Sequence, residues 1–241
     1  LLLTAERSDD LEPLLSSMLD YNLAGMIVTS GTPPAAVIEE CKRLRVPLVL
    51  INRNPEPNGG DRIELDTVAA AKAAFAILHN AGARRFAVLQ PEDRTYTVIG
   101  RVHAFNALVR SKSMTCHMLP CDNQSYDAGR AAAQRHADTL RDCDGLFATT
   151  DLLACGALDG LRLDLGLQVP RDLRVVGFDD IEQASWAAYD LSTVRQDPER
   201  QASIAVEVMQ FRLHMPDAPT LLKHPPLKPI LRGTTGKPDP S

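Results

Sequence analysis

Residues 145–180 read GLFATTDLLACGALDGLRLDLGLQVPRDLRVVGFDD, and this stretch decides the fold class. Residues 145–149 form a short apolar run typical of a buried strand, and residues 151–166 follow with a helical pattern that ends at a glycine. Residues 174–178 form a second apolar run, which stops at two aspartates. Strands that are apolar on both faces are typical of a parallel sheet covered by helices. The stretch therefore predicts a strand–helix–strand unit with parallel strands.

The same alternation of strands and helical segments continues on both sides of this unit. Further strands are predicted at residues 23–29, 46–51, 85–89 and 114–119, with short extended segments at 191–194 and 229–232. Helices are predicted at residues 33–44, 68–80, 98–110, 126–140 and 198–214. Residues 54–60 contain Pro and Gly and are predicted to form a surface loop. This alternation favours an α/β fold with doubly wound parallel sheets, and the strands are too many for one small lobe.

Length and charge limit the classes of protein to consider. The chain has 241 residues, of which 44% are apolar and 24% charged, enough for two α/β lobes of roughly 100 residues each. Its net charge is −5, whereas a free-standing DNA-binding domain is usually basic. Contact with DNA would therefore go through a part that this chain lacks.

Cysteine content and hydropathy favour a cytoplasmic protein. The five cysteines fit no zinc or CxxC spacing, so we expect reduced thiols. No apolar run approaches the roughly 20 residues of a membrane span, so we expect no membrane partner. Residues 1–4 (LLLT) are too short for the core of a signal peptide and are predicted to end a strand that began upstream. The chain is therefore interpreted as a fragment.

Polar side chains gather where the predicted strands end. In open α/β sheets, ligands bind beyond the carboxyl ends of the strands. That rule selects Thr29, Ser30, Asn52, Arg53, Gln90, Thr149, Thr150, Asp151, Asp179 and Asp180. Such groups bind polyhydroxyl or acidic small molecules, because Arg and Asp side chains match paired carboxylates or hydroxyls. Each residue alone is more often an ordinary helix cap, so the set carries more information than its members.

Signatures of catalysis and of cofactor binding are missing from the sequence. It contains no phosphate loop of the GxxxxGK[ST] type, no GxGxxG, no GxSxG and no HExxH. The six histidines are scattered, without a carboxylate at useful spacing. We therefore expect a binding protein without cofactor or metal, rather than an enzyme.

Several short motifs follow one another in a definite order. Residues 177–181 read GFDDI and residues 191–198 read LSTVRQDP. Four further stretches are GARRFAVL (82–89), FATTDLLACGA (147–157), VPRDLRVV (169–176) and RGTT (232–235). In order and spacing, from about residue 10 to residue 236, they resemble the lactose/galactose-repressor family, whose signature is GFDD…LTTVRQP.

The resemblance implies a two-lobed fold of the periplasmic-binding-protein-like type. Two doubly wound parallel-sheet lobes would be joined by three crossover segments. The amino-terminal lobe would comprise residues 1–82 plus 197–217, and the carboxyl-terminal lobe residues 83–196 plus 218–236. Family members begin with a DNA-binding helix-turn-helix head and a first strand–helix unit, and neither is visible in this chain.

The resemblance also implies where a small-molecule effector binds. The family contacts fall on Asp66, Arg101, Thr150 and Asp179, and Trp186 fits a family variant in which an aromatic ring closes over the ligand. A core position is the alternative for Trp186. The predicted effector site combines these five residues with Thr29, Ser30 and Arg53 of the strand-end set.

Three departures from the family pattern bear on which effector is bound. Thr150 and Thr67 stand where the family has Asn, and Ala104 stands where it has Gly. The change to Thr150 shortens the side chain and removes an amide that both donates and accepts hydrogen bonds. None of the three changes disturbs the fold signature.

The resemblance implies the ligand-sensing domain of a transcriptional repressor. A small molecule, a sugar or sugar derivative by the Asp, Arg and Thr set, would bind in the cleft between the lobes and alter operator binding by a population shift. Purines bind some relatives and stay possible effectors. We expect a homodimer that contacts operator DNA only through the missing head. The alternatives are a periplasmic sugar-binding protein of a transport system, and an α/β enzyme, for which no pair of nucleophile and base can be named.

Overall fold

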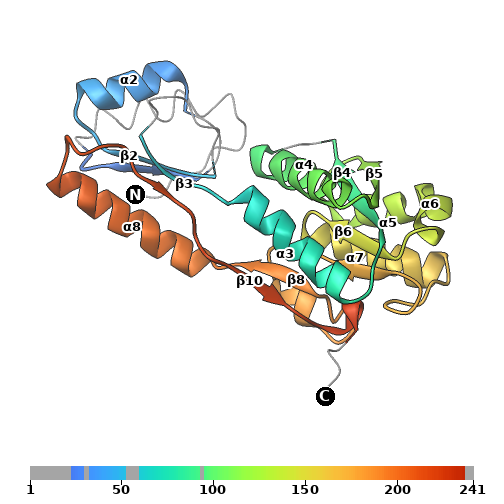
Figure 1. The fold of residues 1–241 in the computed structure, drawn as a ribbon. Coiled ribbons are helices and arrows are strands. Elements are labelled where there is room, and N and C mark those ends of the chain that lie inside the picture. Colours follow the sequence, from blue (N-terminus) through green and yellow to red (C-terminus); the bar gives the residue numbers. More distant parts are fainter. Residues whose placement is uncertain (1–22, 30–32, 53–59, 93–94, 237–241) are drawn as a thin grey trace. The chain divides into compact units, whose positions relative to one another are not determined.

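The computed structural model describes residues 23–29, 33–52, 60–92 and 95–236, and the chain divides into two compact units (Figure 1). Unit 1 comprises residues 1–65 and 198–225, and unit 2 comprises residues 66–197 and 226–241. The chain passes between the units at three places, after residues 65, 197 and 225. Each unit holds its own parallel sheet with packed helices, which confirms the predicted α/β fold class with three crossover segments.

Unit 1 is a parallel sheet with a helix on each face. Its strands, in the order β1-β2-β3-β9, are β1 (Met26–Val28), β2 (Leu48–Ile51), β3 (Asp61–Ile63) and β9 (Leu222–Lys223). Its helices are α2 (Ala35–Arg43) and α8 (Pro198–His214). Leu48 and Leu50 of β2 share a core cluster with α2, while Val49 and Ile51 share one with α8. Both faces of β2 are therefore buried, as its continuous apolar sequence predicts.

A buried ion pair fastens the end of α8 to β3. Arg212 donates from Nη2 to Asp61 Oδ1 at 2.7 Å and from Nε to Asp61 Oδ2 at 2.9 Å. Asp61 Oδ1 also accepts from the backbone N–H of Leu221 at 2.8 Å, just before β9. β3 and β9 are not predicted from the sequence, because they are only three and two residues long and depend on this distant pair.

Unit 2 is built on a second parallel sheet. Its strands, in the order β5-β4-β6-β7, are β4 (Arg85–Pro91), β5 (Thr115–Cys121), β6 (Gly145–Ala148) and β7 (Arg174–Val176). Two further strands, β8 (Thr193–Gln196) and β10 (Leu227–Ile230), pair antiparallel, and bridges at Val176–Ser192 and Asp179–Arg195 join the β8 segment to the end of β7. Its helices are α3 (Thr67–Asn80), α4 (Tyr96–Ser111), α5 (Tyr126–Arg135), α6 (Ala137–Arg141) and α7 (Asp151–Asp159).

The two faces of the unit 2 sheet have different cores. Helices α3 and α4 cover one face with a cluster of aromatic rings from Phe75, Phe86, Phe105 and Phe147, whose successive centroids lie 5.0–6.0 Å apart. Helices α5 and α7 cover the other face, where aliphatic side chains and alanines from both helices meet the alternate strand residues. Close approach of α5 and α7 requires glycine, because a Cβ at Gly156 would lie 1.8 Å from the carbonyl oxygen of Tyr126.

Two predicted helices are interrupted in the structure. The helix predicted at 126–140 breaks at His136, whose ring Nε2 lies 2.8 Å from the carbonyl oxygen of Pro120, so α5 and α6 are separate. The helix predicted at 151–166 is α-helical to Asp159 and continues as a π-helical turn over Gly160–Asp164.

Helix α2 begins at Ala35 rather than at residue 33. Within the described ranges, no helix has both the length and the apolar composition to span a bilayer.

The division into units differs from the predicted lobes at Asp197, which belongs to unit 2, and in two longer segments. Residues 66–82 are predicted in the amino-terminal lobe, whereas α3 belongs to unit 2, because Phe75 packs into the aromatic cluster there. Residues 218–225 are predicted in the carboxyl-terminal lobe, whereas β9 pairs with β3 in unit 1.

Candidate functional site

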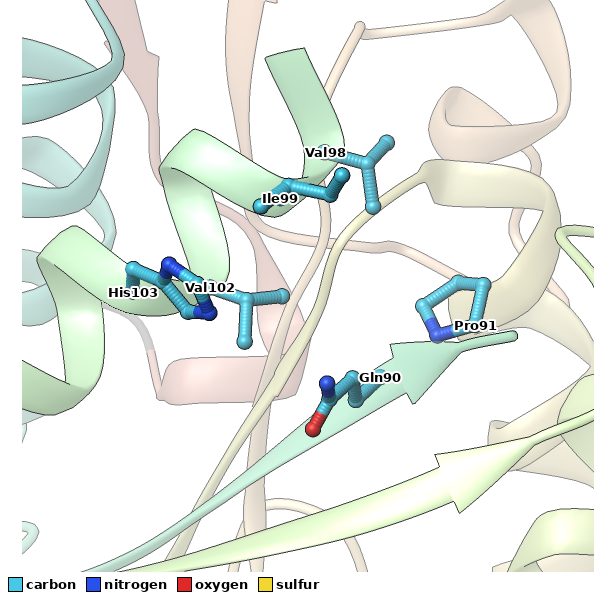
Figure 2. A pocket seen from close by; sticks show the side chains of 6 residues that line it. All are labelled: Gln90, Pro91, Val98, Ile99, Val102 and His103. Atoms are coloured by element: carbon cyan, nitrogen blue, oxygen red, sulfur yellow. The ribbon is translucent and has the colours of Figure 1, made fainter. Parts of the chain in front are cut away.

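The carboxyl ends of β4, β6 and β7 carry most of the polar residues that the sequence singles out in unit 2. Figure 2 shows Gln90 and Pro91 at the end of β4 facing Val98 and Val102 of α4. The space that these side chains enclose is too small for a water molecule. Helix α4 therefore packs closely over the end of β4, and Arg101 lies on this helix next to Val102.

Arg101 is a buried cation at the centre of this strand edge. Its side chain is 3% exposed, and Nη2 donates to the carbonyl oxygen of Thr149 at 3.0 Å. The guanidinium carbon lies 4.0 Å from the centroid of the Phe178 ring, within the range of a cation–π contact. Burial lowers the pKa of Arg101 to about 10, while the nearby Asp179 and Asp151 carboxylates oppose the shift. Arg101 is therefore charged at neutral pH.

Part of the polar edge around Arg101 has no partner. Among the described residues, neither Arg101 Nε nor the hydroxyl of Thr149 has a hydrogen-bond partner, although both atoms are buried. Burial of an unpaired polar group costs roughly 1–3 kcal/mol. Such groups often mark a place where a ligand or an ordered water completes the hydrogen bonds.

Asp179 follows β7 in a conformation that is uncommon for an aspartate. Its φ is +117°, in the region that favours glycine, and the bridge to Arg195 and the hydrogen bond from its N–H to Val194 hold it there. Its Oδ1 accepts from Gln196 Nε2 at 2.8 Å, the one side-chain hydrogen bond that the described residues give this carboxylate. Burial raises the pKa of Asp179, and the Arg101 charge opposes the shift.

Asp151 supports the loop that carries Asp179. It is fully buried, its Oδ1 accepts from Thr193 Oγ1 at 2.6 Å, and its Oδ2 accepts from the Ile181 N–H at 3.0 Å. Burial raises the pKa of Asp151 to about 6, although these hydrogen bonds work in the opposite direction. A Cβ at Gly177 would lie 2.1 Å from Asp151 Oδ1, so glycine is required there.

The second aspartate of the GFDD stretch has a structural role. Asp180 accepts from Arg232 Nη2 at 2.7 Å and from Arg195 Nε at 2.5 Å, so both of its oxygens are engaged. The RGTT stretch also reaches Ser192, whose N–H donates to Thr234 Oγ1 at 2.8 Å. These contacts hold the segment 191–196 beside β7, which explains why the motifs occur together.

Asp66 and Thr150 both serve as helix caps. Asp66 Oδ1 accepts from the Ala69 N–H at 2.8 Å at the start of α3, and Thr150 Oγ1 accepts from the Leu153 N–H at 3.4 Å at the start of α7. The start of α3 also lies close to the Arg101 turn of α4, because a Cβ at Gly100 would be 2.8 Å from the Thr67 side chain.

The remaining predicted site residues are distributed over both units. Thr29 is exposed after β1 in unit 1. Ser30 and Arg53 lie outside the described residues. Trp186 is 47% exposed in unit 2, so the alternative of a core position is wrong. Unit 2 therefore contains Asp66, Arg101, Thr150, Asp179 and Trp186.

Three contributors to the site are not predicted from the sequence: Phe178, Thr193 and Gln196. Phe178 directly precedes Asp179, so its place at the strand end was a usable signal. The roles of Thr193 and Gln196 depend on the pairing of β8 with the end of β7, which no local pattern reveals. Among the described residues, no group of His, Cys, Asp and Glu is arranged to hold a metal ion.

Comparisons with known proteins agree with this architecture. The HTH-type transcriptional repressor MelR of Bacillus subtilis is 28% identical over 201 residues, which cover 80% of this chain and 58% of MelR. A LacI-family transcriptional regulator from Enterococcus faecium, solved with bound ribose, has a TM-score of 0.82 and 21% identity, covering 98% of this chain and 87% of that one. The transcriptional regulator CelR in complex with cellobiose has a TM-score of 0.80 and 22% identity, covering 97% of this chain and 72% of that one.

The matches cover only part of the length of the relatives. The chain spans 58% to 60% of the length of the first curated relatives that it matches. The relatives confirm the resemblance to the lactose/galactose-repressor family. The periplasmic binding protein-like domain family matches residues 75–235, more than half of the chain. The chain therefore belongs to the periplasmic binding protein-like domain family.

Proposed function

We propose that the chain is the ligand-sensing domain of a DNA-binding transcriptional repressor and that its effector is a sugar or a sugar derivative. The names of its relatives support a regulator rather than a periplasmic transport protein. Ribose and cellobiose in two structures of the same fold support a sugar as the class of effector. The two sugars differ in size, so the class is proposed and not the individual molecule.

The arrangement of Arg101 and Asp179 is the observation that carries the proposal. The two charges interact, yet the side-chain hydrogen bond of Arg101 goes to Thr149 and that of Asp179 comes from Gln196. A fixed donor and a fixed acceptor are therefore available at one strand edge. A sugar presents neighbouring hydroxyls that donate and accept, so one ring can bind to both groups.

The proposed site is completed by residues that the family pattern selects. Asp66 and Thr150 cap helices with one oxygen each, and Trp186 offers a half-exposed ring that can pack on the C–H face of a sugar. We include Thr29, Ser30 and Arg53 of unit 1 in the proposed effector site. Since the roles proposed for all of these residues are in binding, we propose no catalytic activity.

The proposed output of the domain is a change in operator binding. An effector that prefers one of two conformations shifts their populations, and the shift would be passed to a helix-turn-helix head outside this chain. Helix-turn-helix heads bind operator DNA in pairs, so we propose that the protein is a homodimer. Because it would act on DNA, we propose that it is located in the cytoplasm. Light scattering of the chain at micromolar concentration should give twice the mass of 26.3 kDa, and a monomer would contradict that part of the proposal.

A thermal-shift screen tests the proposed class of effector. The panel contains neutral sugars, sugar acids, sugar phosphates and purines. A ligand at 100 times its Kd adds about 2.7 kcal/mol to the free energy of unfolding, which raises Tm by several degrees in a domain of this size. We expect the stabilising compounds to be sugars or sugar derivatives. Stabilisation by purines alone, or by nothing in the panel, would contradict the proposal.

A further inference from the structure

Unit 2 contains a cavity at the opposite end of its sheet from Arg101. Its volume is about 610 Å³, and it lies between α3, the segment that leads into β7, and the chain around β10. Small-molecule sites in proteins typically occupy roughly 300–1,000 Å³. The cavity is formed by unit 2 alone.

The floor of this cavity is apolar. Ala73, Ala76 and Ile77 lie at i, i+3 and i+4 on one face of α3, and the small alanine side chains leave the space open. Leu231 lines the cavity after β10 and is 53% exposed, which is high for a leucine beside an apolar surface. Burial of this surface by a ligand would stabilise a complex by about 25 cal/mol for each Å² removed from water.

Two arginines line the cavity, and they differ in their partners. Arg171 donates from Nε and Nη2 to the carboxylate of Asp172 at 2.8 and 3.1 Å, so its charge is already paired. Arg174 is half-buried, and its guanidinium forms no hydrogen bond or ion pair with any residue in the described ranges. Its Nη2 lies over Gly82, where a Cβ would be 3.6 Å away. A half-buried, unpaired cation beside an apolar floor favours a ligand that brings a negative charge.

We propose that this cavity binds a small organic anion with an apolar body, whose carboxylate pairs with Arg174. An arginine binds a carboxylate through two parallel hydrogen bonds, which gives both affinity and orientation. Helix α3 begins beside the Arg101 turn and lines this cavity in its later turns, so its 14 residues separate the two sites by about 20 Å. The anion would therefore bind independently of a sugar at the candidate effector site.

Methyl NMR of the 241-residue chain tests this proposal. Indole-3-acetate is the anionic probe, and indole-3-acetamide is its neutral counterpart of nearly the same shape. We expect indole-3-acetate to shift the methyl signals of Ile77 and Leu231, and to bind at least tenfold more tightly than the amide. No shift of these signals at millimolar probe, or equal binding of acid and amide, would overturn the proposal.

Matched variants locate the charge and the cavity. Arg174→Gln should weaken binding of indole-3-acetate at least tenfold, whereas Arg171→Gln should change it less than twofold because that arginine is already paired. Ala76→Leu fills the cavity from an exposed helix position and should abolish the Ile77 shift while the rest of the spectrum stays native. Full affinity in Arg174→Gln would overturn the proposed pairing, and full affinity in Ala76→Leu would overturn the proposed cavity.

Discussion

The guanidinium of Arg101 lies over the ring of Phe178, with 4.0 Å between the guanidinium carbon and the ring centroid. The ring covers one side of the cation, and the Thr149 carbonyl holds Nη2. Nε is left without a partner among the described residues. The guanidinium is thus oriented in advance, so the Arg101 side chain loses little further conformational entropy when a ligand binds to it.

Arg101→Lys should weaken effector binding although it keeps the charge. A lysine ammonium is a compact charge and lacks the planar fork in which Nη2 binds to the Thr149 carbonyl while Nε points in another fixed direction. We expect the Kd of the sugar identified by the thermal-shift screen to rise at least tenfold in titration calorimetry. Arg110→Lys, an exposed change on the same helix, is the control and should leave Kd within twofold. Unchanged affinity in Arg101→Lys would show that its geometry is irrelevant.

Asp151→Asn should change how stability depends on pH. Burial raises the pKa of Asp151 to about 6 from an ordinary 3.8, so the folded state takes up a proton that the unfolded state does not bind between these values. The ionised carboxylate therefore costs stability above pH 6, and this cost disappears as the pH falls towards 4. The free energy of unfolding of Asp151→Asn minus that of wild type should therefore be about 2 kcal/mol larger at pH 7 than at pH 4. Urea unfolding at both pH values measures the difference, and parallel pH profiles would contradict the shift.

Gly156→Ala should destabilise unit 2. The added Cβ would lie 1.8 Å from the Tyr126 carbonyl oxygen, and both atoms belong to rigid helix backbones. Overpacking of this kind costs about 1–3 kcal/mol, and we expect the upper end because α5 and α7 must separate. Leu152→Ala on the exposed side of the same helix is the control. Thermal unfolding followed by circular dichroism measures both, and equal Tm values would be incompatible with the close approach of the helices.

Arg212→Met should destabilise unit 1, because it leaves Asp61 buried without its cation. Asp61 is 2% exposed, and loss of one partner of a buried ion pair costs about 3–5 kcal/mol. Arg200→Met removes an exposed ion pair with Glu207 from the same helix and should cost no more than about 1 kcal/mol. Urea unfolding of the two variants compares these costs, and similar values would show that the Asp61 pair has no special weight.

Local pattern predicts much of this fold. The continuous apolar run of β2 predicts burial on both faces, which the clusters with α2 and α8 confirm. Pro198 opens α8, as its fixed φ favours at the first position of a helix. In contrast, β3 is held by Arg212, 151 residues away, and such a contact leaves no local signal.

The candidate site is predictable in its positions more than in its roles. The rule of strand ends selects Asp179 and Asp180 together, but only the structure separates them, because Arg195 and Arg232 engage Asp180. Thr150 is a helix cap, as the alternative interpretation of strand-end residues predicts, and Asp66 is a cap as well. Contact of either residue with an effector stays a prediction. Contacts between residues far apart in the chain decide these roles, and no local sequence pattern indicates which distant residues will meet.

Titration calorimetry of the sugar identified by the screen, against wild type and the variants Arg101→Met, Asp179→Asn and the double variant, tests the central claim most directly. If one ligand binds to both groups, each single change should raise Kd at least tenfold. The double variant should then lose less than the sum of the two free-energy changes, because either loss already disrupts the shared ligand. Arg110→Gln is the matched control and should keep the wild-type Kd. Wild-type affinity in both single variants, with the protein folded, would contradict the proposal that Arg101 and Asp179 form the effector site.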